Sequence, residues 1–420
     1  MSTAPAASAD VAVVGAGAAG LATAIFTARR APGLRIVVLD GARTLGAKIL
    51  VSGGGRCNVT NAAVTPADFW RPGSSFVRRV LRSFTVEQTV AFFAGLQVRL
   101  REEPGGKLFP ETNRARTVLS ALLEEASRLG VELRPGHRVL GLERGDGGFV
   151  VGTAGGPLAA RRVVLATGGL SLPKTGSDGA GYGFATALGH SLVPTTPALA
   201  PLVLEGTFHA PLSGISHDAE LRVAAPEQKP VRVRGSLLWT HFGVSGPAAL
   251  DASRFWHRAQ VSGRAARITV SFFPGRDFGA VEAEILEAAR ARPAQRLTTS
   301  LAERLPAALA EAVVSSLGTP GDATLGRLQR EDRRRLVAAL LEWPLSVRGS
   351  RGYGFAEATS GGIPLEEVDP ATMESRLAPG LHLVGEILDV DGRIGGFNFQ
   401  WAWSTAHVAA AALADGATRS

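Results

Sequence analysis

The sequence has a single cysteine, Cys57, among its 420 residues. One cysteine excludes an intramolecular disulfide and any metal site built on cysteine pairs, and it fits a reducing cytoplasm. No run of 18 apolar residues occurs, so no membrane-spanning helix is predicted. The N-terminal stretch MSTAPAASAD has neither a basic region nor an apolar core, which is not typical of a signal peptide. We therefore expect a cytoplasmic protein with no membrane partner and no bound metal.

Lysine is scarce as well, since only four of the 45 basic residues are lysine and the other 41 are arginine. The net charge of +8 either marks a surface that attracts RNA phosphates or reflects the codon usage of a GC-rich genome. Three lysines, Lys48, Lys107 and Lys174, lie in stretches that resemble parts of a site. Lys107 and Lys174 are candidate substrate contacts, and placement on solvated loops by chance is the alternative.

The first forty residues predict a complete βαβ unit. The valine-rich run DVAVV, residues 10–14, is typical of a buried strand, and the helical stretch LATAIFTARR follows the turn GAGAAG. A second buried strand, LRIVVLD, ends at Asp40. In such units the glycine turn and the helix N-terminus bind a dinucleotide pyrophosphate, and the acid binds a ribose hydroxyl. The predicted contacts are Gly15, Gly17, Ala18, Ala19, Gly20 and Asp40.

The next stretch, KILVSGGGRCNVTN, places three glycines beside the only cysteine. A nicotinamide dehydrogenase would continue here with further βαβ units, whereas this chain predicts an irregular glycine-rich loop. The loop has too few apolar side chains to be held by its own core packing, so we expect it to line a large planar cofactor. FAD has that shape. The predicted contacts are Lys48, Ser52, Gly53, Gly54, Gly55, Arg56, Cys57 and Asn58.

Two later stretches predict further parts of the same site. VVLATGG ends a buried strand in a small turn where the middle of a nucleotide would rest. In LVGEILDVDGRIGGFNFQWAWS, an acid at a strand end can bind ribityl hydroxyls, and a helix N-terminus can face the pyrimidine oxygen of a flavin. The predicted contacts are Val139, Ala166, Thr167, Gly168, Gly169, Gly385, Glu386, Asp389, Gly395, Gly396, Phe397 and Asn398.

The middle of the chain predicts two inserts in this α/β frame. Residues 197–275 consist of short alternating segments typical of a small all-β, barrel-like domain, and residues 276–343 are helical and arginine-rich. The first part of the FAD-binding domain would then span residues 8–196. Residues 344–420 would hold the rest of the insert and the return to the FAD-binding domain. Before the inserts, helices are predicted over 85–95 and 114–130, and RVLGLERGDGGFVVGT predicts a β-hairpin.

Five motifs carry a family resemblance: GAGAAG, KILVSGGGRCNVTN, ATGGLSLP, THFGVSGPAAL and GEILDVDGRIGGFNFQWAWS. Together they resemble the BaiN/RdsA-type flavoproteins over about residues 10–412. The resemblance implies a Rossmann-like FAD-binding domain of the two-dinucleotide-binding flavoprotein type, with non-covalent FAD and with a β-barrel insert and a helical insert. Members of that family have been linked to reduction of a uridine of large-subunit ribosomal RNA to dihydrouridine, and to reduction steps in bile-acid metabolism.

An FAD-dependent reductase of ribosomal RNA uridine is therefore the expected function. A reductase or dehydrogenase of a small unsaturated metabolite is the second possibility, and a non-catalytic flavoprotein that binds RNA or senses redox state is the third. No second strand–GxGxxG–helix unit occurs, so a resident NAD(P)H domain is not expected. Either NAD(P)H visits the flavin transiently to reduce it, or the electrons arrive by another route. The sequence does not define the oligomeric state.

The reaction needs a proton as well as a hydride from flavin N5. Cys57 is the candidate acid because a thiol can donate a proton near neutral pH. The alternative is that Cys57 is a small packing residue. His241 and Tyr353 are candidate substrate contacts, although a lone loop histidine is more often structural.

Overall fold

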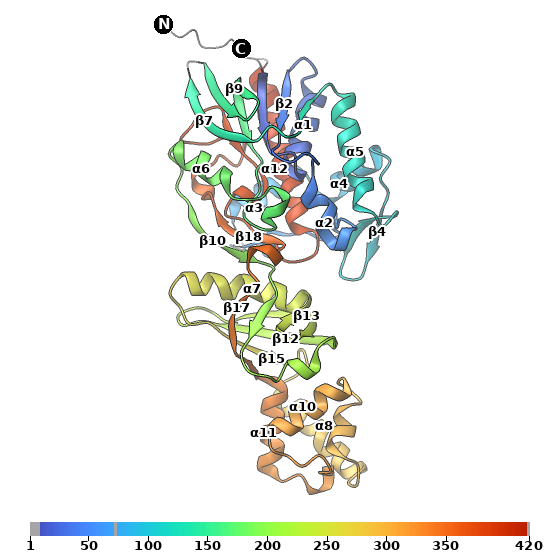
Figure 1. Cartoon of the computed structure of the whole chain (residues 1–420). Coiled ribbons are helices and arrows are strands. Elements are labelled where there is room, and N and C mark those ends of the chain that lie inside the picture. Colours follow the sequence, from blue (N-terminus) through green and yellow to red (C-terminus); the bar gives the residue numbers. More distant parts are fainter. Residues whose placement is uncertain (1–8, 71–73, 146, 418–420) are drawn as a thin grey trace. The chain divides into compact units, whose positions relative to one another are not determined.

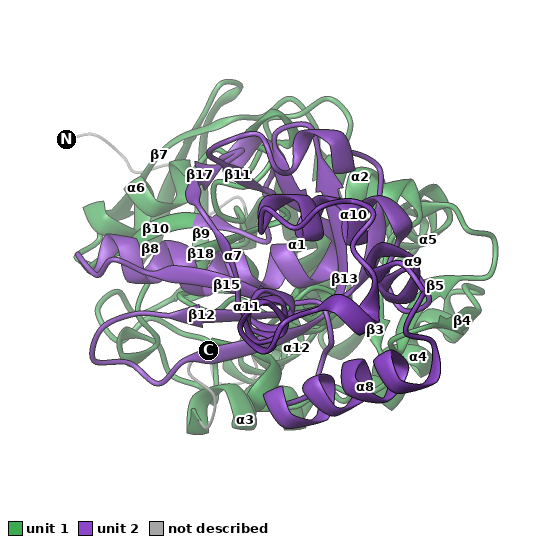
Figure 2. Ribbon diagram, turned by 90° about the horizontal axis from the view of Figure 1, so that it is seen from below, with its two compact units in different colours: residues 1–196, 357–420 green, residues 197–356 purple. Residues whose placement is uncertain are grey.

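The computed structural model describes residues 9–70, 74–145 and 147–417 (Figure 1). The N-terminal residues 1–8, where no signal peptide is expected, and residue 146 of the predicted hairpin turn lie outside the described residues. The chain divides into two compact units (Figure 2). Unit 1 comprises residues 1–196 and 357–420, and unit 2 comprises residues 197–356.

Unit 1 is built on a mainly parallel sheet. The central strand β1 (Ala9–Val14) pairs in parallel with β2 (Ile36–Leu39) on one side and with β9 (Gly156–Leu165) on the other. The strand β19 (Leu381–Leu383) returns from the far end of the sequence to pair with β9. The other strands of this sheet are β6 (Glu132–Arg134), β7 (Val139–Gly145) and β8 (Gly148–Thr153). The predicted Rossmann-like fold and the β7–β8 hairpin are confirmed.

Two helices from opposite ends of the sequence pack against each other in unit 1. Helix α1 (Ala18–Arg30) lies against α12 (Phe397–Ala417), as Figure 1 also shows. Phe26 of α1 contacts Phe84 and Phe92 with ring centroids 5.2 and 4.9 Å away. The remaining helices are α2 (Ala47–Gly55), α3 (Ser75–Ser83), α4 (Val86–Gly95), α5 (Ala115–Arg128) and α6 (Ala180–Ala187). Helices α4 and α5 confirm the two helices predicted before the inserts.

Two small sheets complete unit 1. The strands β3 (Thr60–Asn61), β4 (Leu100–Glu103) and β5 (Lys107–Pro110) form one of them. In the other, β10 (Val193–Ala198) pairs with β18 (Ala358–Gly362). The chain therefore leaves unit 1 and re-enters it through paired strands.

Unit 2 contains a seven-stranded sheet in the order β16-β15-β12-β13-β14-β11-β17. Its edge strands β16 (Trp343–Leu345) and β17 (Val347–Ser350) are separated by one residue, Ser346, so the sheet must curl until its two edges meet. The inner strands are β11 (Leu202–Leu204), β12 (Ser216–Ala224), β13 (Val231–Thr240), β14 (Gly243–Ser245) and β15 (Arg267–Ser271).

The expectation of an all-β insert over residues 197–275 is wrong in one respect. A 16-residue helix, α7 (Gly246–Val261), lies between β14 and β15. Its buried Ala248, Ala252 and Trp256 recur every four residues, which is a helical spacing that the short flanking strands obscured. The proline at the second helical position, Pro247, is also typical of a helix start.

The helical insert shares a hydrophobic core with this sheet. Its helices are α8 (Phe278–Ala291), α9 (Leu297–Leu301), α10 (Ala307–Ser316) and α11 (Arg330–Leu341). One cluster of buried side chains joins Val270 of β15 with Ile285 of α8 and Leu340 of α11. The two predicted inserts are thus parts of a single compact unit.

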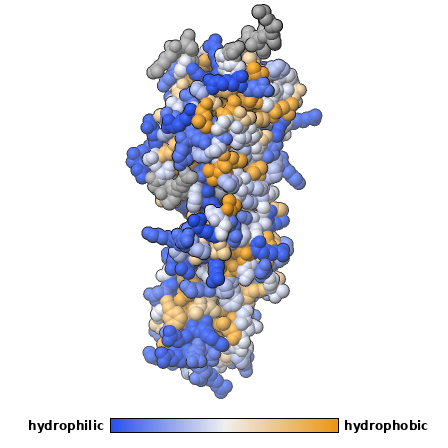
Figure 3. Space-filling model, turned by 90° about the vertical axis from the view of Figure 1, so that its left-hand side faces the viewer, coloured by the Kyte–Doolittle hydropathy of each residue, from blue (hydrophilic) through white to orange (hydrophobic). Residues whose placement is uncertain are grey.

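On the face in Figure 3, hydrophobic residues form small patches between hydrophilic ones. Within the described residues, no helix is both long enough and apolar enough to span a bilayer.

A half-buried histidine makes the stability of unit 1 dependent on pH. His407 of α12 stacks on Phe84 with ring centroids 4.9 Å apart, and its Nε2 lies 2.6 Å from Arg30. Burial, assisted by the Arg30 charge, lowers the pKa of His407 to about 4. The unfolded chain therefore binds an extra proton once the pH falls below about 6.5, and stability is lost from there down to about pH 4.

We expect the His407→Phe variant, which keeps an aromatic ring, to lose less thermal stability than the wild type between pH 7 and pH 5. The difference in the fall of Tm should be about 2–4 °C. The partly exposed His137 supplies the control variant His137→Phe, which should follow the wild type. Equal falls of Tm in all three proteins would contradict the assignment.

Candidate functional site

Three glycine-containing turns meet at the carboxyl ends of neighbouring parallel strands. The turn after β1 is joined to the turn after β9 because the Ala166 N–H donates to the Val14 carbonyl at 2.9 Å. Gly15 has φ +104°, and a Cβ there would lie 2.5 Å from the Ala166 oxygen. The turn after β19 lies close to the start of α1, since a Cβ on Gly385 would lie 2.9 Å from the Cβ of Ala19. Ligands bind at such edges of open α/β sheets.

Gly17 differs from the other glycines of the first turn. It caps α1 with φ −81° and ψ −167°, a conformation open to any residue, and a Cβ there would meet no atom within 4 Å. By contrast, a Cβ on Gly20 would overlap the Gly15 carbonyl. Neither packing nor backbone geometry requires glycine at position 17. The missing side chain leaves the helix N-terminus open, and the first turn, with Ala18 and Ala19, contains no acid. This arrangement fits a pyrophosphate.

Asp40 stabilises the glycine turn, a role that the sequence pattern did not reveal. One carboxylate oxygen accepts the Ala16 N–H and the other accepts the Ala42 N–H, both at 2.8 Å. Each oxygen keeps a lone pair with which a ribose hydroxyl can interact. The Gly136 N–H donates to the Ala42 carbonyl at 3.1 Å, which brings the segment leading to Val139 beside the Asp40 loop.

The stretch KILVSGGGRCNVTN is not the irregular loop that was expected. Helix α2 runs through its first part, and helical geometry breaks only from Ser52. Gly53, Gly54 and Gly55 all have positive φ, at 55°, 68° and 82°. Ile49, Cys57 and Val59 are at most 1% exposed, so the stretch is anchored in the core at both ends. Core packing therefore holds both ends, whereas Gly53 between them is partly exposed and Gly54 and Gly55 are exposed.

Two polar side chains near the three glycines are held differently. Arg56 forms 3.0 Å hydrogen bonds to both oxygens of Glu103 and lies 4.0 Å over the Phe109 ring. Contacts with other residues of unit 1 therefore hold the Arg56 side chain in place. The Asn58 Oδ1 atom, in contrast, is buried and has no hydrogen-bond partner among the described residues. A buried acceptor without a donor is costly, so it fits the polar edge of a bound ligand.

Cys57 is enclosed by protein. Its side chain is 0% exposed, and its backbone has φ +62°, which is unusual for a residue with a side chain. Burial raises the pKa of the Cys57 thiol to about 12, against a smaller opposing effect of a hydrogen bond with Ser52. A thiol that is fully enclosed by protein is poorly placed to protonate a substrate. The structure favours the packing alternative.

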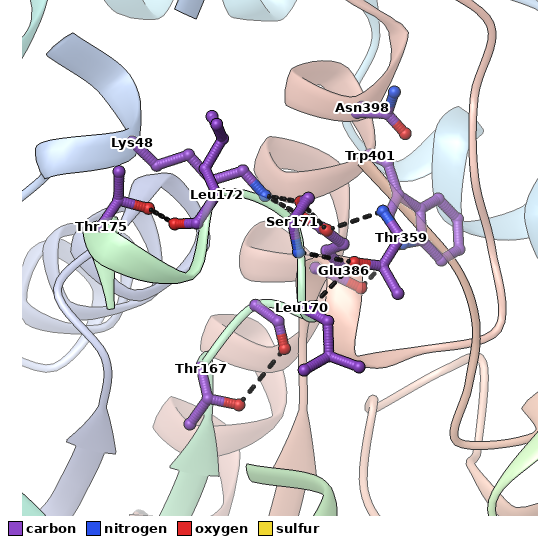
Figure 4. A network of polar contacts seen from close by, with 12 residues as sticks. Lys48, Thr167, Leu170, Ser171, Leu172, Thr175, Thr359, Glu386, Asn398 and Trp401 are labelled. Atoms are coloured by element: carbon purple, nitrogen blue, oxygen red, sulfur yellow. Dashed lines mark hydrogen bonds and ion pairs between the residues drawn. The ribbon is translucent and has the colours of Figure 1, made fainter. Parts of the chain in front are cut away.

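A network of polar side chains joins distant segments at the site (Figure 4). The Lys48 ammonium donates to Glu386 Oε2 and to Ser171 Oγ, each at 2.5 Å. Glu386 Oε1 accepts from the Ser171 hydroxyl at 2.7 Å and from the Thr359 N–H at 2.9 Å. The Thr359 hydroxyl in turn accepts the backbone N–H groups of Leu170 and Ser171.

This network gives Glu386 a second role besides the expected ribityl contact. It joins α2, the turn after β9, the strand β18 and the turn after β19. Only 23% of the Lys48 side chain and 18% of the Glu386 side chain are exposed, so the pair is partly shielded from water. A Cβ on Gly169 would lie 2.5 Å from the Thr359 hydroxyl. Ser171 and Thr359 were missed because neither belongs to a glycine turn, although Ser171 lies only two residues after ATGG.

The N-terminus of α12 is also held close to the first segments. A Cβ on Gly396 would overlap the Thr60 carbonyl, and the Asn61 side chain donates to the Gly395 carbonyl at 3.0 Å. The Asn398 side chain bonds both the N–H and the carbonyl of Gly392, at 2.8 and 3.1 Å, so it clamps the preceding loop. Of the other predicted contacts here, Phe397 and Asp389 are buried.

The four candidate substrate contacts fall in different units. In unit 1, Lys107 is partly exposed on β5 and Lys174 is exposed in the short helix Pro173–Thr175. In unit 2, His241 is exposed between β13 and β14 with its ring edge on Phe242, and Tyr353 is partly buried. Their substrate role remains a prediction.

The fold and this site define a Rossmann-type flavoprotein oxidoreductase that binds FAD. Residues 9–412 match the model of the HI0933-like protein Rossmann domain, so the chain belongs to that family. The chain is 33% identical to an Escherichia coli protein named ribosomal RNA dihydrouridine synthase, with 94% of this chain and 96% of that one aligned. It is 32% identical to a Haemophilus influenzae protein of the same name, over 96% and 97% of the two chains.

A relative with another name is as similar. The chain is 33% identical to a Clostridium scindens protein named 3-dehydro-bile acid delta(4,6)-reductase, with 96% of this chain and 99% of that one aligned. Sequence similarity therefore does not separate the two activities.

We expect Lys48→Met to weaken FAD binding about tenfold, which corresponds to ~1.4 kcal/mol. The change leaves the partly buried Glu386 carboxylate without its cation and loosens four segments at once. Lys48→Arg keeps the charge and should lose less. FAD titration of the apoprotein, followed by flavin fluorescence, measures the effect. Unchanged affinity in Lys48→Met would show that the pair does not organise the FAD site.

We expect Cys57→Ala to keep FAD, its pH–rate profile and turnover within about twofold, because the thiol is a packing group. Stability should fall by about 1 kcal/mol for the removed buried atom. Cys57→Ser, nearly isosteric but polar, is the matched control. A loss of turnover in Cys57→Ala with intact FAD binding would restore the acid hypothesis.

Proposed function

We propose that this chain reduces the C5=C6 bond of a uridine in large-subunit ribosomal RNA to give dihydrouridine. The observation that supports the proposal is the extent of the similarity to the two relatives named ribosomal RNA dihydrouridine synthase. Each alignment covers at least 94% of the chain and therefore extends into unit 2 as well as the FAD-binding frame. Such a reaction would take place in the cytoplasm.

Bound FAD, once reduced by the electron donor, would supply the hydride for the C=C bond. The residues that would hold it are Gly17 and the α1 N-terminus at the pyrophosphate, Asp40 at a ribose, and the Asn58 amide at a polar edge of the ring. The ion pair between Lys48 and Glu386 would hold the surrounding turns in position around the cofactor. The second carbon needs a proton, and the buried Cys57 is poorly placed to deliver it.

The electron donor that we propose is NAD(P)H, binding transiently. Within the described residues, one strand–glycine turn–helix unit of the dinucleotide type occurs, formed by β1 and α1. A second nucleotide would then approach the flavin only long enough to reduce it. Mixing the FAD-loaded protein anaerobically with NADH or NADPH should bleach the flavin absorbance, and a flavin that neither nucleotide bleaches would exclude this donor.

A second candidate function has support of its own. The relative named 3-dehydro-bile acid delta(4,6)-reductase is as similar as the first. Reduction of a conjugated C=C bond in a small metabolite uses the same hydride and proton balance. Binding of a small metabolite, unlike binding of RNA, would not require the net positive charge of the chain.

The decisive experiment is complementation in E. coli lacking the named relative. Dihydrouridine is mapped in its large-subunit RNA after expression of the wild type or of Lys48→Met. We expect the wild type to restore the lost site and Lys48→Met to restore less of it. A map that stays unchanged with wild-type protein carrying FAD would reject the RNA proposal. Turnover of a 3-oxo-Δ4,6 bile acid by the same preparation would then support the second candidate.

A further inference from the structure

One face of the unit 2 sheet concentrates arginine. In the antiparallel pair β12–β13, Arg222 lies opposite Arg232 and Glu220 lies opposite Arg234. In the pair β12–β15, Ala224 lies opposite Arg267. Residues opposite each other in antiparallel strands, and alternate residues along a strand, project from the same face. The four arginines therefore share one face across three adjacent strands.

This face points to solvent. The residues that alternate with it, Leu221, Val223, Ile268 and Val270, are at most 4% exposed and belong to the core of unit 2. The side chains of Arg232 and Arg234, in contrast, are 65% and 62% exposed. We call Arg222, Arg232, Arg234 and Arg267, with the hydroxyl residues Ser216, Ser236, Thr269 and Ser271 on the same face, the arginine face.

The charge of the arginine face is not balanced within the fold. Arg232 and Arg234 share one carboxylate, that of Glu220, whose side chain is only 4% exposed beneath them. Among the described residues, Arg222 and Arg267 form no ion pair. The other acid of the face is Asp218, two residues before Glu220 on β12. The arginine face thus holds four guanidinium groups and two carboxylates, and one of these carboxylates, that of Glu220, is buried.

Folding stability does not account for this arrangement. Like charges directly opposite on an antiparallel pair are destabilising, and Arg222 is directly opposite Arg232. The cost falls when a polyanion lies over both guanidinium groups. Hydroxyl groups between the arginines add donors of the kind that bind phosphate oxygens.

The helical part of unit 2 shows no such concentration. There Arg292 pairs with Glu303 and Arg333 pairs with Glu282, while Arg290 and Arg327 are exposed on separate segments. Codon bias alone would place arginines without regard to their partners. The concentration on one sheet face therefore favours the phosphate interpretation of the net charge for this part of the chain.

We propose that the arginine face of β12, β13 and β15 binds the phosphate backbone of RNA. The proposal rests on the proposed function, because it supplies the RNA substrate with a docking surface in unit 2 that is distinct from the FAD site of unit 1. The recognition is of phosphate charge and not of base sequence.

The test compares two double variants of the FAD-loaded, full-length protein. Arg222→Gln/Arg267→Gln removes the two unpaired arginines of the face. Arg290→Gln/Arg327→Gln removes the same charge from exposed arginines of the helical part that form no ion pair with a described residue. Filter binding of an unmodified large-subunit RNA transcript is measured over a range of salt concentrations.

We expect the face variant to bind RNA at least tenfold more weakly and the slope of log K against log[salt] to shrink by about 1.4, for two phosphate contacts on single-stranded RNA. The control variant should keep the wild-type slope. Flavin bleaching should be equal in all three proteins, which shows that each is folded. Equal affinity and slope in the face variant and the wild type would overturn the proposal, as would a wild type that binds no RNA.

The outcome is separable from that of the proposed function. If the face variant loses RNA binding but the wild type forms no dihydrouridine, the surface stands and the proposed reaction fails. If dihydrouridine forms and the face variant keeps both its KM and its salt slope, the reaction stands and the surface is rejected. A face variant that loses binding only to anionic lipid vesicles would also reject RNA as the occupant.

Discussion

The ion pair between Lys48 and Glu386 is the contact on which the site depends. The two residues are 338 positions apart in the sequence, and their side chains meet at 2.5 Å in a partly shielded environment. Ser171 and Thr359 extend the contact to two more segments. Removal of either residue would leave a shielded charge without its partner, and this costs more stability than the loss of a surface ion pair. The four segments therefore depend on the same contact.

The glycine turns can gather around this network only because backbone replaces side chain where they touch. Gly15 lies against the Ala166 carbonyl, and Gly396 lies against the Thr60 carbonyl. Gly17 has no such neighbour, and this separates a glycine that serves packing from one that leaves room for a ligand. Asp40 also has two roles. It accepts two backbone N–H groups and so stabilises the turn, and its carboxylate still places a negative charge beside that turn.

Under the proposed function, the two units would contribute different surfaces. Unit 1 supplies a glycine-lined edge with a buried Asn58 acceptor. Unit 2 supplies a sheet whose outer face bears unbalanced positive charge. Phosphate charge attracts over several ångströms and tolerates many orientations, whereas a flavin ring needs close contact, so different parts of one chain suit the two ligands.

The local sequence pattern by itself determined those features that depend only on residues close together in the chain. The strand–GAGAAG–helix unit, the acid at Asp40 and helices α4 and α5 follow from periodicity and turn chemistry, which act over a few residues. Tertiary structure decided the rest. The pairing of Lys48 with Glu386, the enclosure of Cys57 and the register that puts Arg222 opposite Arg232 join residues through the folded core. No local spacing specifies which distant side chains will meet, because packing selects those contacts only when the whole chain is in place.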